Sequence, residues 1–254
     1  MNNYQIINSV ARSVDILKCL SNGINRLTDI SNRLQINKAA THRILKTLEI
    51  KQIVVQEPVS RRYFLGPVIQ TIASNPLAVH KILIESSIQE MEILGKSCGE
   101  TVVLQIIRGG QRVVLEKVAG NEMIRFYPES MEIAPVHTGA GGRVLLAGLE
   151  DAQLDKLLQR LNFEKMTSLT ITDVDTLRAK IEQVRQQGYS ISTGESVKDA
   201  IAIAVPITSY FYPATLIVVG PKLRLEQKKG IIVKKAIKAG TAISKRLADI
   251  LKKV

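Results

Sequence analysis

The feature that most limits what this chain can fold into is a run of short elements between Leu27 and Leu65. Its apolar residues repeat as a helix, a turn and a second helix, and a short β-hairpin follows that ends in Arg61-Arg62-Tyr63-Phe64-Leu65. A helix that presents cationic side chains, with a basic hairpin beside it, is typical of a module that lies on DNA. This segment therefore predicts a DNA-binding domain at the N-terminal end.

The second helix of this run is expected over Lys38 to Ile50, with Ala40, Ile44, Leu45 and Leu48 as its buried stripe. Its other faces carry the side chains that we expect to contact DNA, and the hairpin adds two arginines. The candidate DNA-binding residues are Lys38, Thr41, His42, Arg43, Lys46, Arg61 and Arg62. Arginine can bond both O6 and N7 of guanine, and a helix N-terminus favours phosphate. The alternative is a solvated helix face.

Length and charge agree with this interpretation. A chain of 254 residues suits two modest domains. Its net charge of +12 is uneven, because residues 1–76 carry +6, residues 77–221 carry −3 and residues 222–254 carry +9. Basic ends attract nucleic acid by releasing condensed counterions, although a lysine-rich run is more often a solvated surface.

The remainder of the chain predicts an α+β domain, an antiparallel sheet with helices around it. Expected helices cover 77–95, 143–149, 151–161, 173–187 and 224–252, and expected strands cover 101–107, 112–118, 123–126, 201–207 and 214–219. The last two strands are nearly continuous apolar runs, so we expect them to be central and buried. Gly139-Ala140-Gly141-Gly142 is expected to be a tight loop before the next helix.

Other functional classes have little support in the sequence. Cys19 and Cys98 give neither a metal-binding spacing nor a disulfide framework, and His42, His80 and His137 are far apart. We expect no metal, no cofactor and no catalytic residue, and an enzyme is only a remote alternative. No apolar run is long enough for a membrane span and the first residues do not resemble a signal peptide, so we expect a cytoplasmic protein.

With these elements in place, the chain resembles the IclR family of prokaryotic transcriptional regulators over nearly its whole length. Each matching fragment is short, and their order and spacing are what make the resemblance specific. The N-terminal fragments are Arg12-Ser13-Val14-Asp15-Ile16-Leu17, Lys38, His42-Arg43-Ile44-Leu45 and Arg62-Tyr63-Phe64-Leu65-Gly66. The C-terminal fragments are Gly99-Glu100-Thr101, Pro135-Val136-His137, Gly142-Arg143, Leu145-Leu146-Ala147, Gly188-Tyr189, Glu195, Ala204-Val205-Pro206 and Gly220-Pro221.

The resemblance implies a winged helix-turn-helix domain over 1–65, a linker helix over 66–76 and a GAF-like effector-binding and oligomerisation domain over 77–254. It also implies a homodimer or homotetramer that binds double-stranded operator DNA, with repression as the commoner outcome. Family members commonly have Ser-Thr where this chain has Ala39-Ala40. Two hydroxyl groups are therefore lost, and we expect an operator sequence that differs from those of the family.

The resemblance also implies a pocket for a small organic acid, with Gly139, Ala140 and Gly141 offering backbone N–H groups to its carboxylate. An Asp, a Cys and two Ser that hold glyoxylate or pyruvate in relatives fall on Ser192, Ala202, Ile217 and Val219. Since an apolar wall cannot replace hydrogen bonds to so polar an acid, we expect neither as the effector.

Two alternatives stay open for this pocket. The first is a larger or more apolar acid, or an aromatic compound, with Met123 and Phe126 as extra lining. The second is a degenerate pocket in a regulator that binds DNA without sensing any metabolite.

Overall fold

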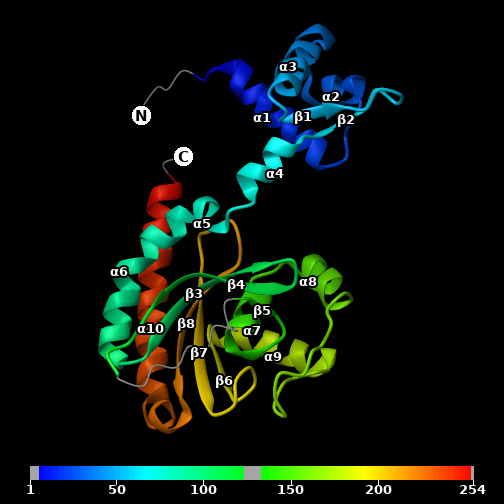
Figure 1. Ribbon diagram of the computed structural model, residues 1–254. Coiled ribbons are helices and arrows are strands. Elements are labelled where there is room, and N and C mark those ends of the chain that lie inside the picture. The colour runs from blue at the N-terminus through cyan, green and yellow to red at the C-terminus, as the bar shows by residue number, and fades with distance from the viewer. Residues whose placement is uncertain (1–5, 123–132, 253–254) are drawn as a thin grey trace. The chain divides into compact units, whose positions relative to one another are not determined.

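The structure, a computed structural model, describes residues 6–122 and 133–252 (Figure 1). The described residues form two compact units, one up to Val79 and the other from His80 onward. None of their helices is long and apolar enough to cross a membrane. The strand expected around residues 123–126, and with it the pocket residues Met123 and Phe126, lies outside the described residues.

The first unit is helical with one small hairpin, as the sequence predicts. Its elements are α1 (Asn8–Ser21), α2 (Leu27–Leu34), α3 (Lys38–Ile50), β1 (Val54–Gln56), β2 (Tyr63–Leu65), α4 (Pro67–Ala73) and α5 (Pro76–Val79). The bounds of α3 are those predicted. Ile16, Ile30, Leu45, Val54 and Tyr63 meet in one core, each of them almost fully buried. This core joins α1, α2 and α3 to the hairpin.

The linker expected over 66–76 contains α4 and the turn that leads into α5. Both helices belong to the first unit. Gly66 begins this stretch because it lies against the backbone of Gln52 and Ile53, where a Cβ would overlap the Gln52 carbonyl. The division of the chain into functional segments at residues 65 and 76 stays a prediction.

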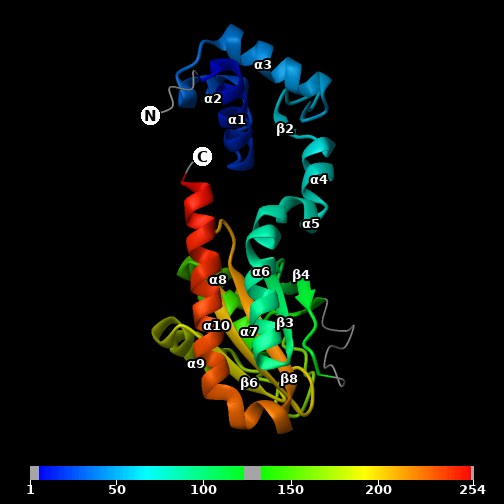
Figure 2. The same ribbon diagram turned by 90° about the vertical axis from the view of Figure 1, so that its left-hand side faces the viewer.

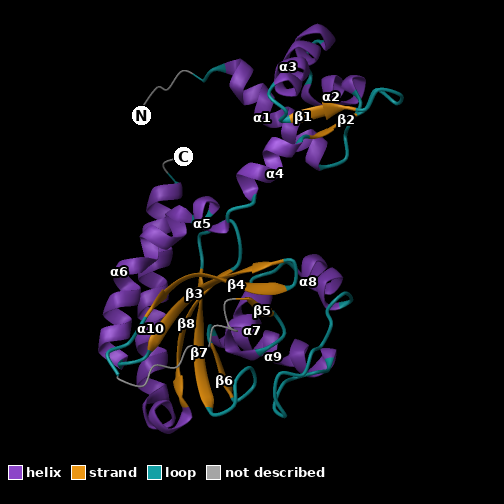
Figure 3. Cartoon of the chain, viewed as in Figure 1, coloured by secondary structure: helices purple, strands orange, loops and turns teal. Residues whose placement is uncertain are grey.

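The second unit is built on a six-stranded antiparallel sheet in the order β5-β4-β3-β8-β7-β6 (Figure 3). Its strands are β3 (Thr101–Arg108), β4 (Gln111–Val118), β5 (Ile133–Pro135), β6 (Ser190–Thr193), β7 (Ala200–Ile207) and β8 (Ala214–Pro221). The two apolar runs are interior strands, as predicted. Strand β6 was not predicted, because its polar sequence Ser-Ile-Ser-Thr resembles a loop.

Helices cover both faces of this sheet, which explains why β7 and β8 are apolar throughout. Long helices α6 (Lys81–Cys98) and α10 (Lys222–Leu251) lie on one face (Figures 1 and 2), where Leu104, Leu216 and Ile203 contribute to a shared core. Helices α7 (Gly139–Ala147) and α9 (Val174–Gln187) lie on the other face, and α8 (Asp151–Leu158) packs beside them. Val103 and Ile217, each one residue along from the first set, point to that second face.

The glycine run at residues 139–142 forms the first turn of α7, so the prediction of a loop there was wrong. Close packing explains the glycines, since a Cβ on Gly142 would overlap the carbonyl oxygen of Val136. Gly139 also has a φ of +70°, a conformation that other residues rarely adopt. The glycine-rich sequence is typical of a loop, but the segment is helical, and its glycines allow the helix to lie close to its neighbours.

This packing predicts opposite effects for two glycine-to-alanine substitutions. Gly142→Ala should lower the free energy of unfolding by about 1–3 kcal/mol, because the new methyl group forces the backbone apart. Gly230→Ala in α10 is the control, because its Cβ would meet open space and alanine favours a helix by about 0.5–1 kcal/mol. Urea unfolding followed by circular dichroism measures both. A Gly142→Ala variant as stable as the wild type would contradict the packing argument.

Candidate nucleic-acid interface and effector pocket

Helix α3 begins at a well-defined cap. The side chain of Asn37 accepts a hydrogen bond from the N–H of Ala40 at 3.1 Å, which satisfies one of the free donors of the first turn. Leu45 and Leu48 then anchor the helix in the core. The opposite side of α3 is left to solvent.

Four of the predicted DNA contacts lie together on that side. Lys38, His42 and Lys46 are spaced four residues apart, so they share one face, and Arg43 lies next to them; all four are exposed. This is the arrangement that a major groove requires of a recognition helix.

Thr41 does not belong to this face, and its prediction as a DNA contact is corrected. Its side chain has no exposed surface, and its hydroxyl group donates to the carbonyl oxygen of Asn37 at 3.1 Å. A threonine in a helix can satisfy its hydroxyl group on the preceding turn in this way and then pack inside. Ala40 and Ile44, expected in the buried stripe, are only half-buried.

Lys46 already has a partner on its own helix. Its Nζ lies 2.7 Å from Oε2 of Glu49, and the hydrogen bond raises the pKa of Lys46 and lowers that of Glu49. Both side chains are solvent-accessible, so the pair is weak and a phosphate can displace the glutamate.

The hairpin holds two further cations beside α3. Strands β1 and β2 pair antiparallel, and the carboxylate of Glu57 closes their connection by accepting from the N–H groups of Val59 and Ser60. Hydrogen bonds from Ser60 hold the pKa of Glu57 below its ordinary value. Arg61 and Arg62 follow at this connection and both are exposed. The hairpin thus has the form of a wing with a basic tip.

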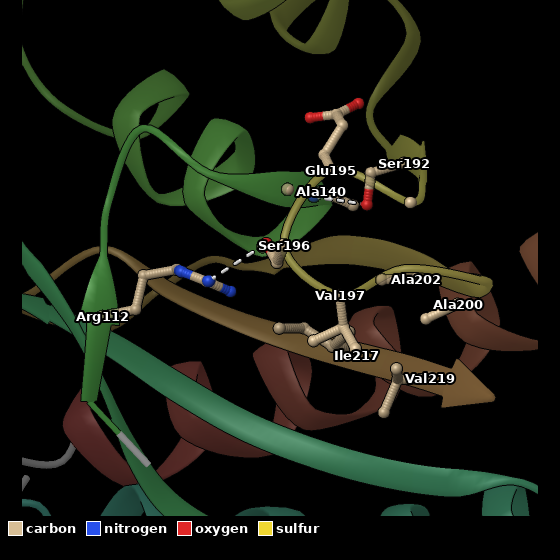
Figure 4. Close-up of a pocket in the computed structure, with 13 residues that line it drawn as sticks. Arg112, Ala140, Ser192, Glu195, Ser196, Val197, Ala200, Ala202, Ile217 and Val219 are labelled. Carbon is tan, nitrogen blue, oxygen red and sulfur yellow. Dashed lines mark hydrogen bonds between the residues drawn. The ribbon is translucent and has the colours of Figure 1, made fainter. Parts of the chain in front are cut away.

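In the second unit, the predicted effector residues that the structure describes meet at one pocket (Figure 4). The first turn of α7 supplies Gly139, Ala140 and Gly141 from one side. Strands β6, β7 and β8 supply the others, which are Ser192, Ala202, Ile217 and Val219. Residues from four distant parts of the chain therefore converge as the resemblance implied.

Other lining residues were not predicted. Arg112 enters from β4 and is almost fully buried, and the β6–β7 loop contributes Ser196 and Val197 (Figure 4). The sequence marks none of them, because an arginine in an alternating strand is usually exposed and a serine in a loop is unremarkable. Arg112 donates to Thr138 Oγ1 at 2.8 Å and to Ser196 Oγ at 3.4 Å.

The pocket is nearly filled by its own walls. Ser192 Oγ accepts a hydrogen bond from the N–H of Ala140 at 3.0 Å, so a group expected to bind a carboxylate is engaged within the chain. A Cβ on Gly141 would overlap Cδ1 of Ile217, which shows how closely α7 approaches the sheet. The remaining cavity volume is about 20 Å³. That is room for a water molecule and not for an organic acid.

Glu195 lies at the edge of this pocket and is part of a structural ion pair. Its carboxylate is 2.5 Å from a terminal nitrogen of Arg143, whose side chain is 3% exposed. The same guanidinium donates to Ser190 Oγ and to the carbonyl oxygen of Ile191. This network joins α7 to β6 and thereby holds Ser192 in position.

The groups that would suggest an enzyme have structural roles. His137 is buried against Phe163 with Nε2 2.9 Å from the carbonyl oxygen of Glu164, and burial lowers its pKa. Burial also raises the pKa of the Cys98 thiol at the end of α6, which disfavours a reactive thiolate. Within residues 6–122 and 133–252, no cluster of side chains could hold a metal ion.

The arrangement defines a DNA-binding regulator, with a winged helix-turn-helix unit joined to a GAF-like unit that contains a narrow cavity between α7 and the sheet. Comparison with known protein families agrees for both units. Residues 77–245 match the model of the bacterial transcriptional regulator IclR C-terminal domain, and residues 9–58 match that of the IclR helix-turn-helix domain. The chain belongs to the IclR family, whose members are transcriptional regulators and not enzymes.

Individual relatives are moderately similar. The chain is 30% identical to the transcriptional regulator XynR of Escherichia coli over 208 residues, which cover 81% of this chain and 82% of XynR. It is 25% identical to the Escherichia coli transcriptional repressor AllR, over 87% of this chain and 83% of AllR. Among solved structures, an IclR regulator from Alicyclobacillus acidocaldarius is 26% identical, with a TM-score of 0.56 over 97% of this chain and 99% of that one.

The internal hydrogen bond of the pocket can be tested by Ser192→Ala. The substitution leaves the buried N–H of Ala140 without its acceptor, so the free energy of unfolding should fall by about 1–3 kcal/mol. Ser168→Ala, at an exposed position of the same unit, is the control and should change stability by less than about 0.5 kcal/mol. Thermal unfolding measures both, and equal stability of the two variants would mean that Ala140 finds another acceptor.

Proposed function

We propose that α3 enters the major groove of double-stranded operator DNA and that the wing contacts the adjacent backbone or minor groove. The contacting residues would be Lys38, His42, Arg43, Lys46, Arg61 and Arg62, all of them exposed. The observation that carries this proposal is the division of α3 into a buried side and a cationic side. Phosphate contacts fix the position of such a helix, and contacts to base edges give the sequence preference.

The chain acts as a homodimer, or as a tetramer of two dimers, and pairs two recognition helices with two half-sites of an operator. Repression follows where the operator overlaps the region that RNA polymerase occupies. The relative AllR, which is named a repressor, supports this outcome. Membership of the family supports the pairing of a DNA-binding unit with a regulatory unit.

The regulatory unit responds to a small organic effector other than glyoxylate or pyruvate. Ala202, Ile217 and Val219 offer no hydrogen bonds, so a small and highly polar acid would lose its partners on entering. A larger, more apolar acid or an aromatic compound matches these walls better. It has to displace part of the β6–β7 loop, because the cavity of about 20 Å³ is too small for it.

A second candidate is a regulator that binds DNA and senses no metabolite. The observation that favours it is the bond from Ala140 to Ser192, which already occupies a group that an effector would use. The two candidates differ in one respect, namely whether any compound changes the affinity for DNA. Only a ligand that binds one conformation better than another can do so.

The DNA-binding proposal is tested with Arg43→Ala and the DNA upstream of the gene for this chain. The substitution should weaken specific binding by more than about 1 kcal/mol, because a bidentate arginine–guanine contact contributes about 1–3 kcal/mol. Titration at several salt concentrations separates the two kinds of contact. Loss of a phosphate contact lowers the salt dependence by about one counterion, and loss of a base contact leaves it unchanged.

Arg160→Ala is the matched control, because it removes one exposed arginine from the second unit. Its binding should equal that of the wild type. The proposal fails if Arg43→Ala and Arg160→Ala bind equally well, or if the wild type binds no DNA at low salt. The same titration with a panel of organic and aromatic acids decides between the two candidates for the regulatory unit.

A further inference from the structure

One buried polar atom beside the pocket is not accounted for by the fold. Gln105 lies on β3 and is 1% exposed, and its Oε1 has no hydrogen-bond partner among the described residues. A buried acceptor left unpaired is costly, so almost all such groups in folded proteins have a partner. A glutamine at this position therefore requires a reason that packing alone does not supply.

The sheet register places Gln105 between the two ends of the pocket. Gln105 pairs with Val114 of β4 on one side and with Thr215 of β8 on the other. Side chains two residues apart on a strand share a face. Arg112 on β4 and Ile217 on β8 are each two residues along from these partners, so both lie on the same face as Gln105, and both line the pocket.

The first turn of α7 lies directly over this amide. A Cβ built on Gly141 would be 3.0 Å from Oε1 of Gln105 and would overlap Ile217. Gly141 itself lines the pocket. The unpaired oxygen thus faces the first turn of α7 beside Ile217.

We propose that the effector is a hydroxy acid, whose hydroxyl group donates a hydrogen bond to Oε1 of Gln105. This inference rests on the proposed effector response of the same pocket and adds the chemical class of the ligand. The carboxylate faces Arg112, where the bond to Ser196 at 3.4 Å is long and readily exchanged. The hydrocarbon part lies against Ala202, Ile217 and Val219.

This geometry gives a basis for selectivity. An acid without the hydroxyl group leaves Oε1 of Gln105 unpaired in a drier site, and a site built for a hydroxyl group rejects an analogue that lacks one. Binding requires the β6–β7 loop at Gly194, Ser196 and Val197 to move outward, because these residues close the present cavity. Ser196 and Val197 lie beyond the β6–β7 ladder, which ends at the pair of Thr193 and Ile201, so they form the part of the wall that moves.

The test uses matched pairs of acids that differ by one hydroxyl group, para-hydroxybenzoate with benzoate and mandelate with phenylacetate. Calorimetric titration of the full chain should show that at least one hydroxy acid binds about tenfold more tightly than its partner. Gln105→Leu, similar in volume and without the acceptor, should abolish that preference. Gln186→Leu, at an exposed position on α9, is the control and should keep it.

Thermal unfolding without added acid gives a second measurement. Gln105→Leu should raise the Tm by about 2 °C or more, because a buried side chain whose oxygen has no hydrogen-bond partner is replaced by an apolar group. A lower Tm would mean that a bound water or the protein satisfies the amide, and would overturn the proposal. So would equal binding of the paired acids, an unchanged preference in Gln105→Leu, or no binding of any of the four acids.

DNA titration of the same preparations separates this inference from the proposed function. Gln186→Leu and the wild type should bind DNA equally in the absence of acid. If both bind DNA and no hydroxy acid is preferred, the ligand class is wrong and the DNA-binding function stands. If neither binds DNA, the proposed function itself fails.

Discussion

The second unit depends on how closely the first turn of α7 approaches the sheet. At Gly139, Gly141 and Gly142 a Cβ would meet, in turn, the Ser196 hydroxyl group, Ile217 and the Val136 carbonyl group. Because no side chain separates the helix from the strands, the N–H groups of its first turn come within reach of residues on β6, and Ala140 bonds to Ser192. The same closeness limits the cavity to about 20 Å³, so one constraint sets both the polarity and the size of the pocket.

The charged side chains beside the pocket are largely buried and paired within the protein. Arg143 is 3% exposed and is satisfied by Glu195, Ser190 and Ile191. A buried ion pair of this kind adds little net stability, but removal of either partner is strongly destabilising. It therefore acts as a positional constraint, fixing β6 against α7 and fixing Ser192 at the pocket.

The helices and strands that the sequence predicted correctly are those whose residue pattern has a single physical explanation. The bounds of α3 follow from an unbroken helical period, and β7 and β8 follow from apolar runs that only a sheet covered on both faces explains. Prediction failed where two causes compete. Thr41 has the sequence context of a surface residue, but its hydroxyl group is satisfied within its own helix. The Gly139–Gly142 run resembles a loop, but its glycines serve the close approach of a helix to its neighbours.

The seven predicted pocket residues that the structure describes converge, because the resemblance fixed their places in the chain. Arg112 and Gln105 could not be found in this way, since a polar residue in a strand gives no sign of facing a second, covered surface. To see which face these two side chains share, one needs the pairing register of β3, β4 and β8. The five DNA-binding predictions on α3 depended on helical phase, and Thr41 is the one of them that the structure buries. Arg61 and Arg62 were predicted from the hairpin sequence, and both are exposed.

The pairing of Lys46 with Glu49 has a consequence for how the chain searches DNA. A carboxylate on the proposed recognition helix repels every phosphate equally, whatever the base sequence, and so shortens each random encounter. At the operator, contacts to base edges compensate for the displaced glutamate. An acidic residue amid cations would thus lower the affinity for every DNA site, so that the preference for the operator would rest on contacts to base edges and dissociation from other sites would be fast.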